Sequence, residues 1–299
     1  MTREKITAQP VVIIGAGRSG TNMLRDVLTR LQGVDTWPCD EINYIWRHGN
    51  RDAETDEFSA EQATPVVSNF IRTQFTSIVR EQGLLSYPEG ERFIVEKTCA
   101  NSLRVPFVDS VLPEAKYIFL IRDGRDVIAS ARKRWQAPLN IPYLVSKAKY
   151  VPKSDFYYYA SRYLLNRLSK SANADKALSV WGPKFEGMKA MSGKESLDYV
   201  CACQWVHCVE SSQLAFDKIE KSRVISIRYE KFVAQPVTVL ESIAQFVGLR
   251  HNTEDLELAC EQVRTGSVGK GQADHLDQRL LDVMAPTLTK YGYLDDAWS

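Results

Sequence analysis

Short, uninterrupted apolar runs alternate along this chain with longer stretches of helical periodicity. The apolar runs, rich in β-branched and aromatic residues, are Val11–Ile14, Phe93–Val95, Tyr117–Ile121 and Val224–Ile227. Such runs are expected for parallel strands that are buried on both faces of a sheet. Helical patterns follow at Thr21–Leu31, Glu61–Gln82, Asp126–Trp135, Glu195–Lys221, Pro236–Val247 and Leu276–Tyr291. This order predicts an α/β fold of three layers, with a central parallel sheet flanked by helices.

Residues 136–194 interrupt this pattern. The segment is rich in Tyr and Lys, contains no clear strand, and is broken by Gly182-Pro183 and Gly187. We interpret it as a helical and loop insertion on the substrate side of a single domain spanning residues 1–299. The alternative is a solvated helical cap that does not contact substrate.

Composition and charge narrow the possible environments. The chain has 299 residues, 44% hydrophobic and 25% charged, with a formal net charge of +1. A net charge this small gives the protein no overall electrostatic attraction to nucleic acid or to an anionic membrane, so neither partner is expected. No apolar stretch approaches the roughly 20 residues of a membrane span, and the six cysteines fit no zinc or redox spacing. We therefore expect a cytoplasmic protein with buried, reduced thiols, and the sequence does not indicate an oligomeric state.

The first apolar run leads into a glycine-spaced turn and then a helix. Glycines let backbone N–H groups point inward at an anion, and the helix start adds the positive end of its dipole. Gly15 and Gly20 have the spacing of the P-loop pattern G-x-x-x-x-G-K-[ST], which predicts a P-loop-like fold. Thr21 and Asn22 stand where that pattern requires Lys and then Ser or Thr, and Arg18 lies inside the loop instead. We therefore expect a phosphate ligand that needs no metal, bound by Gly17, Arg18, Ser19, Gly20, Thr21 and Asn22.

A second candidate phosphate site follows the third apolar run. Arg122 directly follows that run, where open α/β sheets bind ligands, and Ser130 lies on the helix after it. A planar guanidinium and a hydroxyl that converge could hold a phosphate dianion. The alternative is a structural ion pair of Arg122 with Asp123 or Asp126.

These motifs together resemble the sulfotransferases that use 3′-phosphoadenosine 5′-phosphosulfate (PAPS). The loop Gly17–Thr21 resembles their 5′-phosphosulfate loop, in the branch with Arg that includes many bacterial enzymes and the tyrosylprotein sulfotransferases. Arg122 and Ser130 resemble the 3′-phosphate motif. Three further segments resemble the strand end with a cation near the sulfuryl group, the strand whose Tyr approaches adenosine, and the C-terminal loop over the cofactor. They supply Lys97, Tyr229, Ser267 and Lys270, although Gly271 stands where the family more often has Trp.

The resemblance implies in-line transfer of a sulfuryl group from PAPS to a hydroxyl or amine, releasing adenosine 3′,5′-bisphosphate without a metal. It implies that Arg18 contacts the leaving oxygen and Lys97 the sulfuryl oxygens, while Thr21 and the amides of Ser19 and Gly20 hold the 5′-phosphate. Glu41 is the expected general base, by likeness to the tyrosylprotein branch. Asp40 and His48 remain alternatives.

Two other function classes fit parts of the sequence. A P-loop kinase or other nucleotide phosphotransferase explains the spacing of Gly15 and Gly20, but it lacks the P-loop lysine and gives the Arg122–Ser130 pair no role. A non-catalytic nucleotide-binding protein would not need Arg18, Lys97 and Glu41 together. The acceptor is open among carbohydrate, small metabolite, lipid and peptide.

Overall fold

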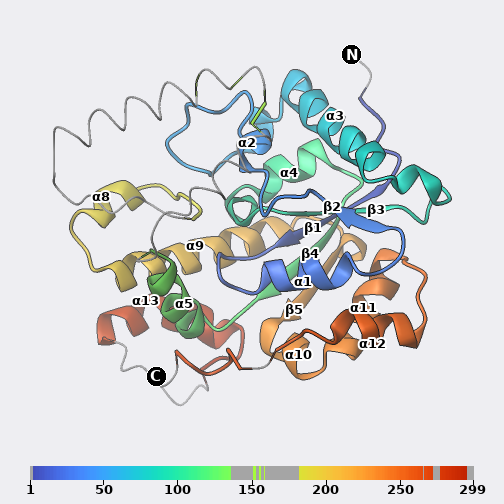
Figure 1. Ribbon diagram of the computed structural model, residues 1–299. Helices are drawn as coiled ribbons and strands as arrows, with labels where there is room; N and C mark the ends of the chain where they lie inside the picture. The colour runs from blue at the N-terminus through green and yellow to red at the C-terminus, as the bar shows by residue number, and fades with distance from the viewer. Residues whose placement is uncertain are drawn as a thin grey trace.

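The protein is built around a five-stranded parallel sheet (Figure 1). The computed structural model describes residues 3–135, 151–152, 155, 158, 182–264, 266–271 and 277–294. The strands are β1 (Gln9–Ile14), β2 (Val34–Thr36), β3 (Phe93–Lys97), β4 (Lys116–Ile121) and β5 (Val224–Arg228). Their order across the sheet is β2-β3-β1-β4-β5, and every neighbouring pair is parallel. The predicted α/β class and parallel sheet are confirmed.

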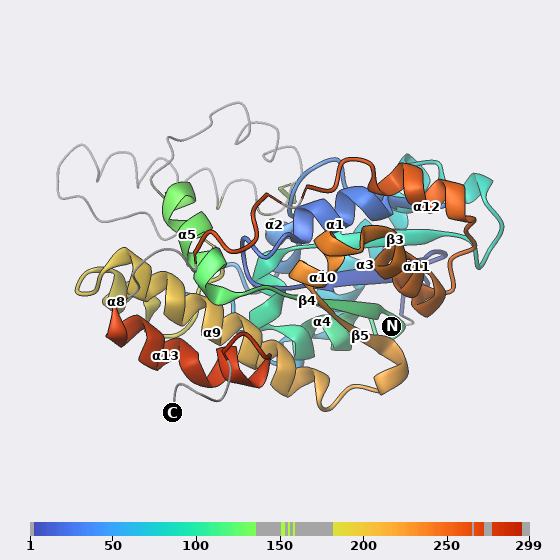
Figure 2. The same cartoon turned by 90° about the horizontal axis from the view of Figure 1, so that it is seen from below.

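Helices cover both faces of the sheet and make the three predicted layers (Figure 2). One face carries α1 (Thr21–Leu28), α10 (Tyr229–Ala234), α11 (Pro236–Val247) and α12 (Thr253–Cys260). The other carries α2 (Asn43–Trp46), α3 (Pro65–Glu81), α4 (Val105–Val111), α5 (Gly124–Trp135), α8 (Met188–Ser192), α9 (Leu197–Phe216) and α13 (Gln278–Lys290). Short 3₁₀ turns lie at Ala60–Gln62, Leu84–Ser86, Cys99–Leu103 and Lys221–Arg223.

Successive side chains of a strand point to opposite faces of the sheet, so each strand contributes to two separate cores. Val12 and Ile14 of β1 pack in one core, whereas Val11 and Ile13 pack in the other. Each is at most 2% exposed, and burying a side chain of this size contributes roughly 1.5–3 kcal/mol. Because both faces are covered, the central strands read as continuous apolar runs.

The prediction that both faces of β5 are buried was wrong, and the sequence analysis did not identify β2. Only Ile227 of β5 is buried, because this strand lies at the edge of the sheet and part of it faces solvent. At the opposite edge, β2 has three residues and a single apolar side chain, Val34, so no periodic pattern identifies it.

Helix ends follow local capping. The predicted helix Pro236–Val247 is confirmed with the same bounds. Helix α3 begins at Pro65 rather than Glu61, because Thr64 accepts a hydrogen bond from the N–H of Val67 and proline favours the first helical position. Helix α1 ends at Leu28, three residues earlier than predicted.

The predicted insertion at 136–194 lies mostly outside the described residues. Its described end contains α8. Of the cysteines, Cys201, Cys203 and Cys208 are buried on α9. All six cysteines lie within the described residues, and none of them forms a disulfide. None of the helices in the described ranges is both long and apolar enough to span a membrane.

Candidate active site

Four strands deliver the predicted site residues to one edge of the sheet. The strands are parallel, so their carboxyl ends meet at the same edge, where α/β sheets bind ligands. The phosphate loop follows β1, Lys97 ends β3, Arg122 follows β4, and Tyr229 follows β5. The structure therefore brings together segments that lie far apart in the sequence, from Arg18 to Tyr229.

The phosphate loop has the backbone shape of an anion-binding turn. Arg18 has φ of 74° and Gly20 has φ of 91°, both in the left-handed region, and α1 begins at Thr21. A Cβ on Gly20 would lie 2.3 Å from the ring of Tyr229, so only glycine fits between the loop and that ring. The N–H of Ser19 donates to the carbonyl of Ala16 at 3.1 Å. In this structure the turn itself uses this amide, and a contact of Ser19 with the 5′-phosphate stays a prediction.

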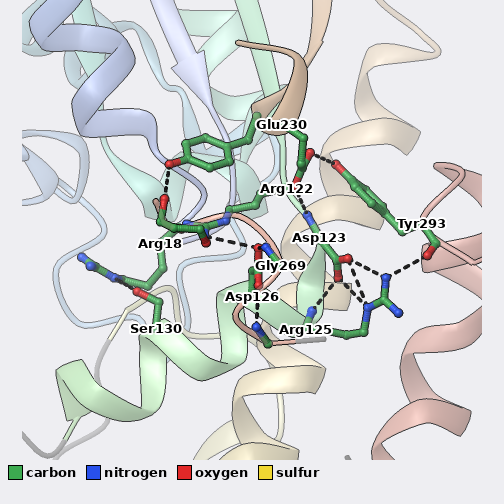
Figure 3. Close-up of polar contacts among 12 residues, drawn as sticks. Arg18, Arg122, Asp123, Arg125, Asp126, Ser130, Glu230, Gly269 and Tyr293 are labelled. Atoms are coloured by element: carbon green, nitrogen blue, oxygen red, sulfur yellow. Dashed lines mark hydrogen bonds and ion pairs between the residues drawn. The ribbon is translucent and has the colours of Figure 1, made fainter. Parts of the chain in front are cut away.

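Arg18 is tied to helix α5 (Figure 3). Its Nε donates to Oγ of Ser130 at 3.0 Å. Burial of part of its guanidinium lowers the pKa of Arg18, and the neighbouring Arg134 and Arg122 act in the same direction. The sequence predicts that Ser130 binds the 3′-phosphate together with Arg122. In this structure its hydroxyl accepts from the cation of the phosphate loop, and the role at the 3′-phosphate stays a prediction.

Arg122 joins three segments of the site. Its Nη1 donates to the Arg18 carbonyl at 3.1 Å, its Nη2 donates to the Ser267 carbonyl at 2.6 Å, and its guanidinium lies over the Tyr229 ring at 4.3 Å. An ion pair with Asp126 is longer, at 3.5 Å. Among the described residues, its buried Nε has no hydrogen-bond partner. A buried donor left unpaired is costly, so this atom fits an oxygen of a bound anion.

The C-terminal loop closes the same edge. The hydroxyl of Tyr229 lies 2.7 Å from Oγ of Ser267, and Lys270 is exposed. Gly271 is buried, and a Cβ there would lie 2.1 Å from the carbonyl of Arg125. The chain therefore passes too close to α5 for the Trp that the family more often has.

The candidate base and the third cation form an ion pair. Nζ of Lys97 donates to Oε1 of Glu41 at 3.0 Å, and the N–H of Cys99 donates to the same oxygen at 3.3 Å. Burial alone would lower the pKa of Lys97, but Cys99 and the Glu41 carboxylate outweigh it and raise that pKa. Burial and Glu41 also raise the pKa of the Cys99 thiol to about 12. The pair borders a small open pocket that Trp37, Cys39 and Asp40 also line.

A buried network that sequence reasoning missed supports Glu41 from behind. Oγ1 of Thr98 donates to Glu96 at 2.6 Å and accepts the N–H of Ile42 at 3.2 Å. Burial raises the pKa of Glu96, whose carboxylate also accepts from Asn101 at 2.8 Å. The network fixes the backbone beside Glu41. The only signal in the sequence is a charged residue at the end of an apolar strand.

The two alternative bases have other partners. The Asp40 carboxylate lies 3.8 Å from Nη2 of Arg25. Nδ1 of His48 lies 2.8 Å from Asp155, and its ring stacks on Phe70 at 3.7 Å. Within the described ranges, no group of three or more His, Cys, Asp or Glu residues could hold a metal ion.

Comparison with known proteins identifies the family. The model of the sulfotransferase family matches residues 10–180, more than half of the chain. The sulfotransferase domain from the curacin biosynthetic pathway has the same fold, with a TM-score of 0.55 at 14% identity over 96% of this chain and 98% of that one. The sulfotransferase domain of the Synechococcus PCC 7002 olefin synthase gives 0.53 at 15% identity over 99% and 98%. No curated protein sequence matches the chain. The chain therefore belongs to the sulfotransferase family, and the sulfuryl transfer expected from its sequence is the activity of that family.

Proposed function

We propose that this protein transfers the sulfuryl group of PAPS in line to a hydroxyl or amine acceptor, with Glu41 as general base. Cations follow or end three separate strands at one sheet edge, and this arrangement supports the proposal most directly. Arg18 follows β1, Arg122 follows its neighbour β4, and Lys97 ends β3, the neighbour of β1 on the other side. Three separated cations suit a ligand with anionic groups at both ends.

The residues of the site fit this donor. When bound, PAPS supplies the sulfuryl group, whose bond to the 5′-phosphate breaks as a bond to the acceptor oxygen or nitrogen forms. The loop residues Gly17, Arg18, Gly20, Thr21 and Asn22 would hold the 5′ end, with Ser130 steadying Arg18. At the other end, the unpaired Nε of Arg122 supports a 3′-phosphate site completed by Ser267 and Lys270, with Tyr229 beside the adenosine.

The three catalytic candidates have separate roles. Arg18 stabilises negative charge on the leaving oxygen, and Lys97 stabilises the sulfuryl oxygens; fixed cations in a partly buried site favour the charge that develops in the transition state. Glu41 accepts the proton that the acceptor loses. Because Glu41 lies 3.0 Å from Lys97, the base and the cation that holds the transferred group face the same point.

Radiolabelled sulfur tests the proposal. The protein is incubated with [³⁵S]PAPS and a panel of carbohydrate, phenol, lipid-alcohol, amine and peptide acceptors, and labelled product is separated. Glu41→Gln should lower the rate by about 10²–10⁴-fold, the usual contribution of a general base, with unchanged affinity for adenosine 3′,5′-bisphosphate. Asp40→Asn, the matched control at the neighbouring acid, should keep the rate within about threefold.

Two results would contradict the proposal at different points. Unchanged turnover in Glu41→Gln removes the base assignment and leaves the donor standing. Phosphate transfer from ATP–Mg²⁺, with no label transferred from PAPS to any acceptor, removes the donor.

A further inference from the structure

Asp126 binds the backbone of the C-terminal loop from the first turn of α5. Its side chain is 1% exposed. Oδ1 accepts the N–H of Gly271 at 2.6 Å, and Oδ2 accepts the N–H of Gly269 at 2.9 Å (Figure 3). Each oxygen of one carboxylate therefore holds one of the two residues that flank Lys270.

The opposite end of this loop is held by the candidate phosphate ligands. Arg122 donates to the carbonyl of Ser267, and Tyr229 shares a hydrogen bond with the Ser267 hydroxyl. Close packing at Gly271, where a Cβ would meet the carbonyl of Arg125, presses the loop against α5. The loop backbone is thus determined at both ends of the short segment 266–271.

The charge of Asp126 makes this contact unexpected at an anion site. A carboxylate 3.5 Å from Arg122 would, by its field alone, weaken the binding of a phosphate nearby. Its two oxygens, however, are occupied by backbone N–H groups, so the carboxylate organises the donors around it. If Asp126 favours phosphate binding, the gain from positioning the loop must outweigh the repulsion between its carboxylate and the phosphate.

We propose that Asp126 is a positioning residue for the 3′-phosphate of the donor: it holds Lys270 and the C-terminal loop in place beside Arg122. The inference rests on the proposed function, since the anion in question is the 3′-phosphate of PAPS. A simpler role exists for an acid in the first turn of a helix, which is to stabilise the helix dipole. That role affects stability alone and does not distinguish ligands with and without a 3′-phosphate.

Calorimetry on Asp126→Asn separates these roles. Affinities are measured for adenosine 3′,5′-bisphosphate and for adenosine 5′-monophosphate, which lacks the 3′-phosphate. The asparagine amide offers one acceptor oxygen where two N–H groups need two, so the loop loses a contact. Affinity for the bisphosphate should fall on the order of tenfold, the usual effect of losing one charge-assisted hydrogen bond, while affinity for the monophosphate stays unchanged. A purely electrostatic role gives the opposite sign, with tighter bisphosphate binding.

Asp123→Asn is the matched control. This neighbouring acid is also buried, but its carboxylate pairs with Arg125 at 2.6 Å, whereas the N–H groups of Gly269 and Gly271 donate to Asp126. The control should keep the ratio of the two affinities at the wild-type value. A ratio that falls equally in both variants overturns the inference, because the effect is then general to this helix turn.

Gly271→Ala tests the same loop without changing any charge. The added Cβ must displace the backbone that Asp126 binds, so the same selective loss of bisphosphate affinity is expected, and this variant carries the test if Asp126→Asn does not fold. Wild-type selectivity retained in the folded variants overturns the inference alone. A wild-type protein that does not prefer the bisphosphate overturns the proposed function, and the inference with it.

Discussion

Breaking the Lys97–Glu41 pair from its two sides should destabilise the protein to unequal degrees. The Lys97 side chain is 2% exposed, whereas that of Glu41 is 27% exposed. Lys97→Met keeps the length of the side chain and removes the cation. Glu41→Gln keeps the shape and removes the anion.

The loss in free energy of unfolding expected for each variant follows from which charge is left behind and how deeply it is buried. Removing one member of a buried ion pair costs about 3–5 kcal/mol, because the other charge is left unpaired. Glu41→Gln strands the buried Lys97 ammonium, so we expect a loss of about 3 kcal/mol, at the lower end because the glutamine oxygen still accepts a hydrogen bond. Lys97→Met leaves a carboxylate that reaches solvent and still accepts the Cys99 N–H, so a loss of about 1 kcal/mol is expected.

Urea unfolding of the wild type and the two variants measures both losses. Folded proteins are stable by about 5–15 kcal/mol, so urea unfolding can resolve a difference of about 2 kcal/mol between the two variants. PAPS should also stabilise Glu41→Gln more than Lys97→Met, because its sulfuryl oxygens give the stranded Lys97 a new partner. A larger loss in Lys97→Met, or losses below about 0.5 kcal/mol in both variants, would show that the buried Lys97 charge does not depend on Glu41 in this way.

Three further changes have defined outcomes. Gly20→Ala forces a left-handed alanine into the Tyr229 ring; we expect a loss of at least about 1–2 kcal/mol in unfolding free energy and weaker nucleotide binding by calorimetry, and wild-type affinity would contradict this. Thr98→Val removes a buried hydroxyl with two hydrogen bonds and should cost about 1–3 kcal/mol in urea unfolding; a neutral result would show that the network does not support the site. The thiols of Cys99, Cys201 and Cys208 have a higher pKa in the folded protein than the value of about 8.5 in the unfolded chain. Their contribution to the free energy of unfolding is therefore complete below about pH 8.5. It is lost as the pH rises towards 12, by up to about 1.4 kcal/mol per thiol and pH unit. Urea unfolding at pH 8 and pH 10 should show this fall, and Cys208→Ala should reduce it; equal stability at the two pH values would contradict it. Burial raises the pKa to about 12 for Cys99, Cys201 and Cys208.

The sequence predicts the centre of this fold better than its edges. Buried central strands such as β1 and β4 produce continuous apolar runs, and their parallel arrangement explains why Arg122 reaches the phosphate loop. At the edges, β2 is too short for a pattern and β5 is only partly buried.

The partners of individual site residues depend on information that local patterns lack. Ser130 bonds Arg18 rather than Arg122 because of how α5 packs against the phosphate loop. The contacts of Asp126 join residues 143 and 145 positions apart, so no spacing motif reveals them. The role of residues 136–194 stays a prediction.

Calorimetric titration with adenosine 3′,5′-bisphosphate in the presence of EDTA is the first test of PAPS as the donor. The wild type should bind this ligand more tightly than adenosine 5′-monophosphate, without a divalent metal. In Arg122→Ala the preference should disappear while binding of the monophosphate persists, which also shows that the variant is folded. Tighter binding of ATP–Mg²⁺ than of the bisphosphate would contradict PAPS as the donor, and an undiminished preference in Arg122→Ala would contradict the 3′-phosphate site at Arg122.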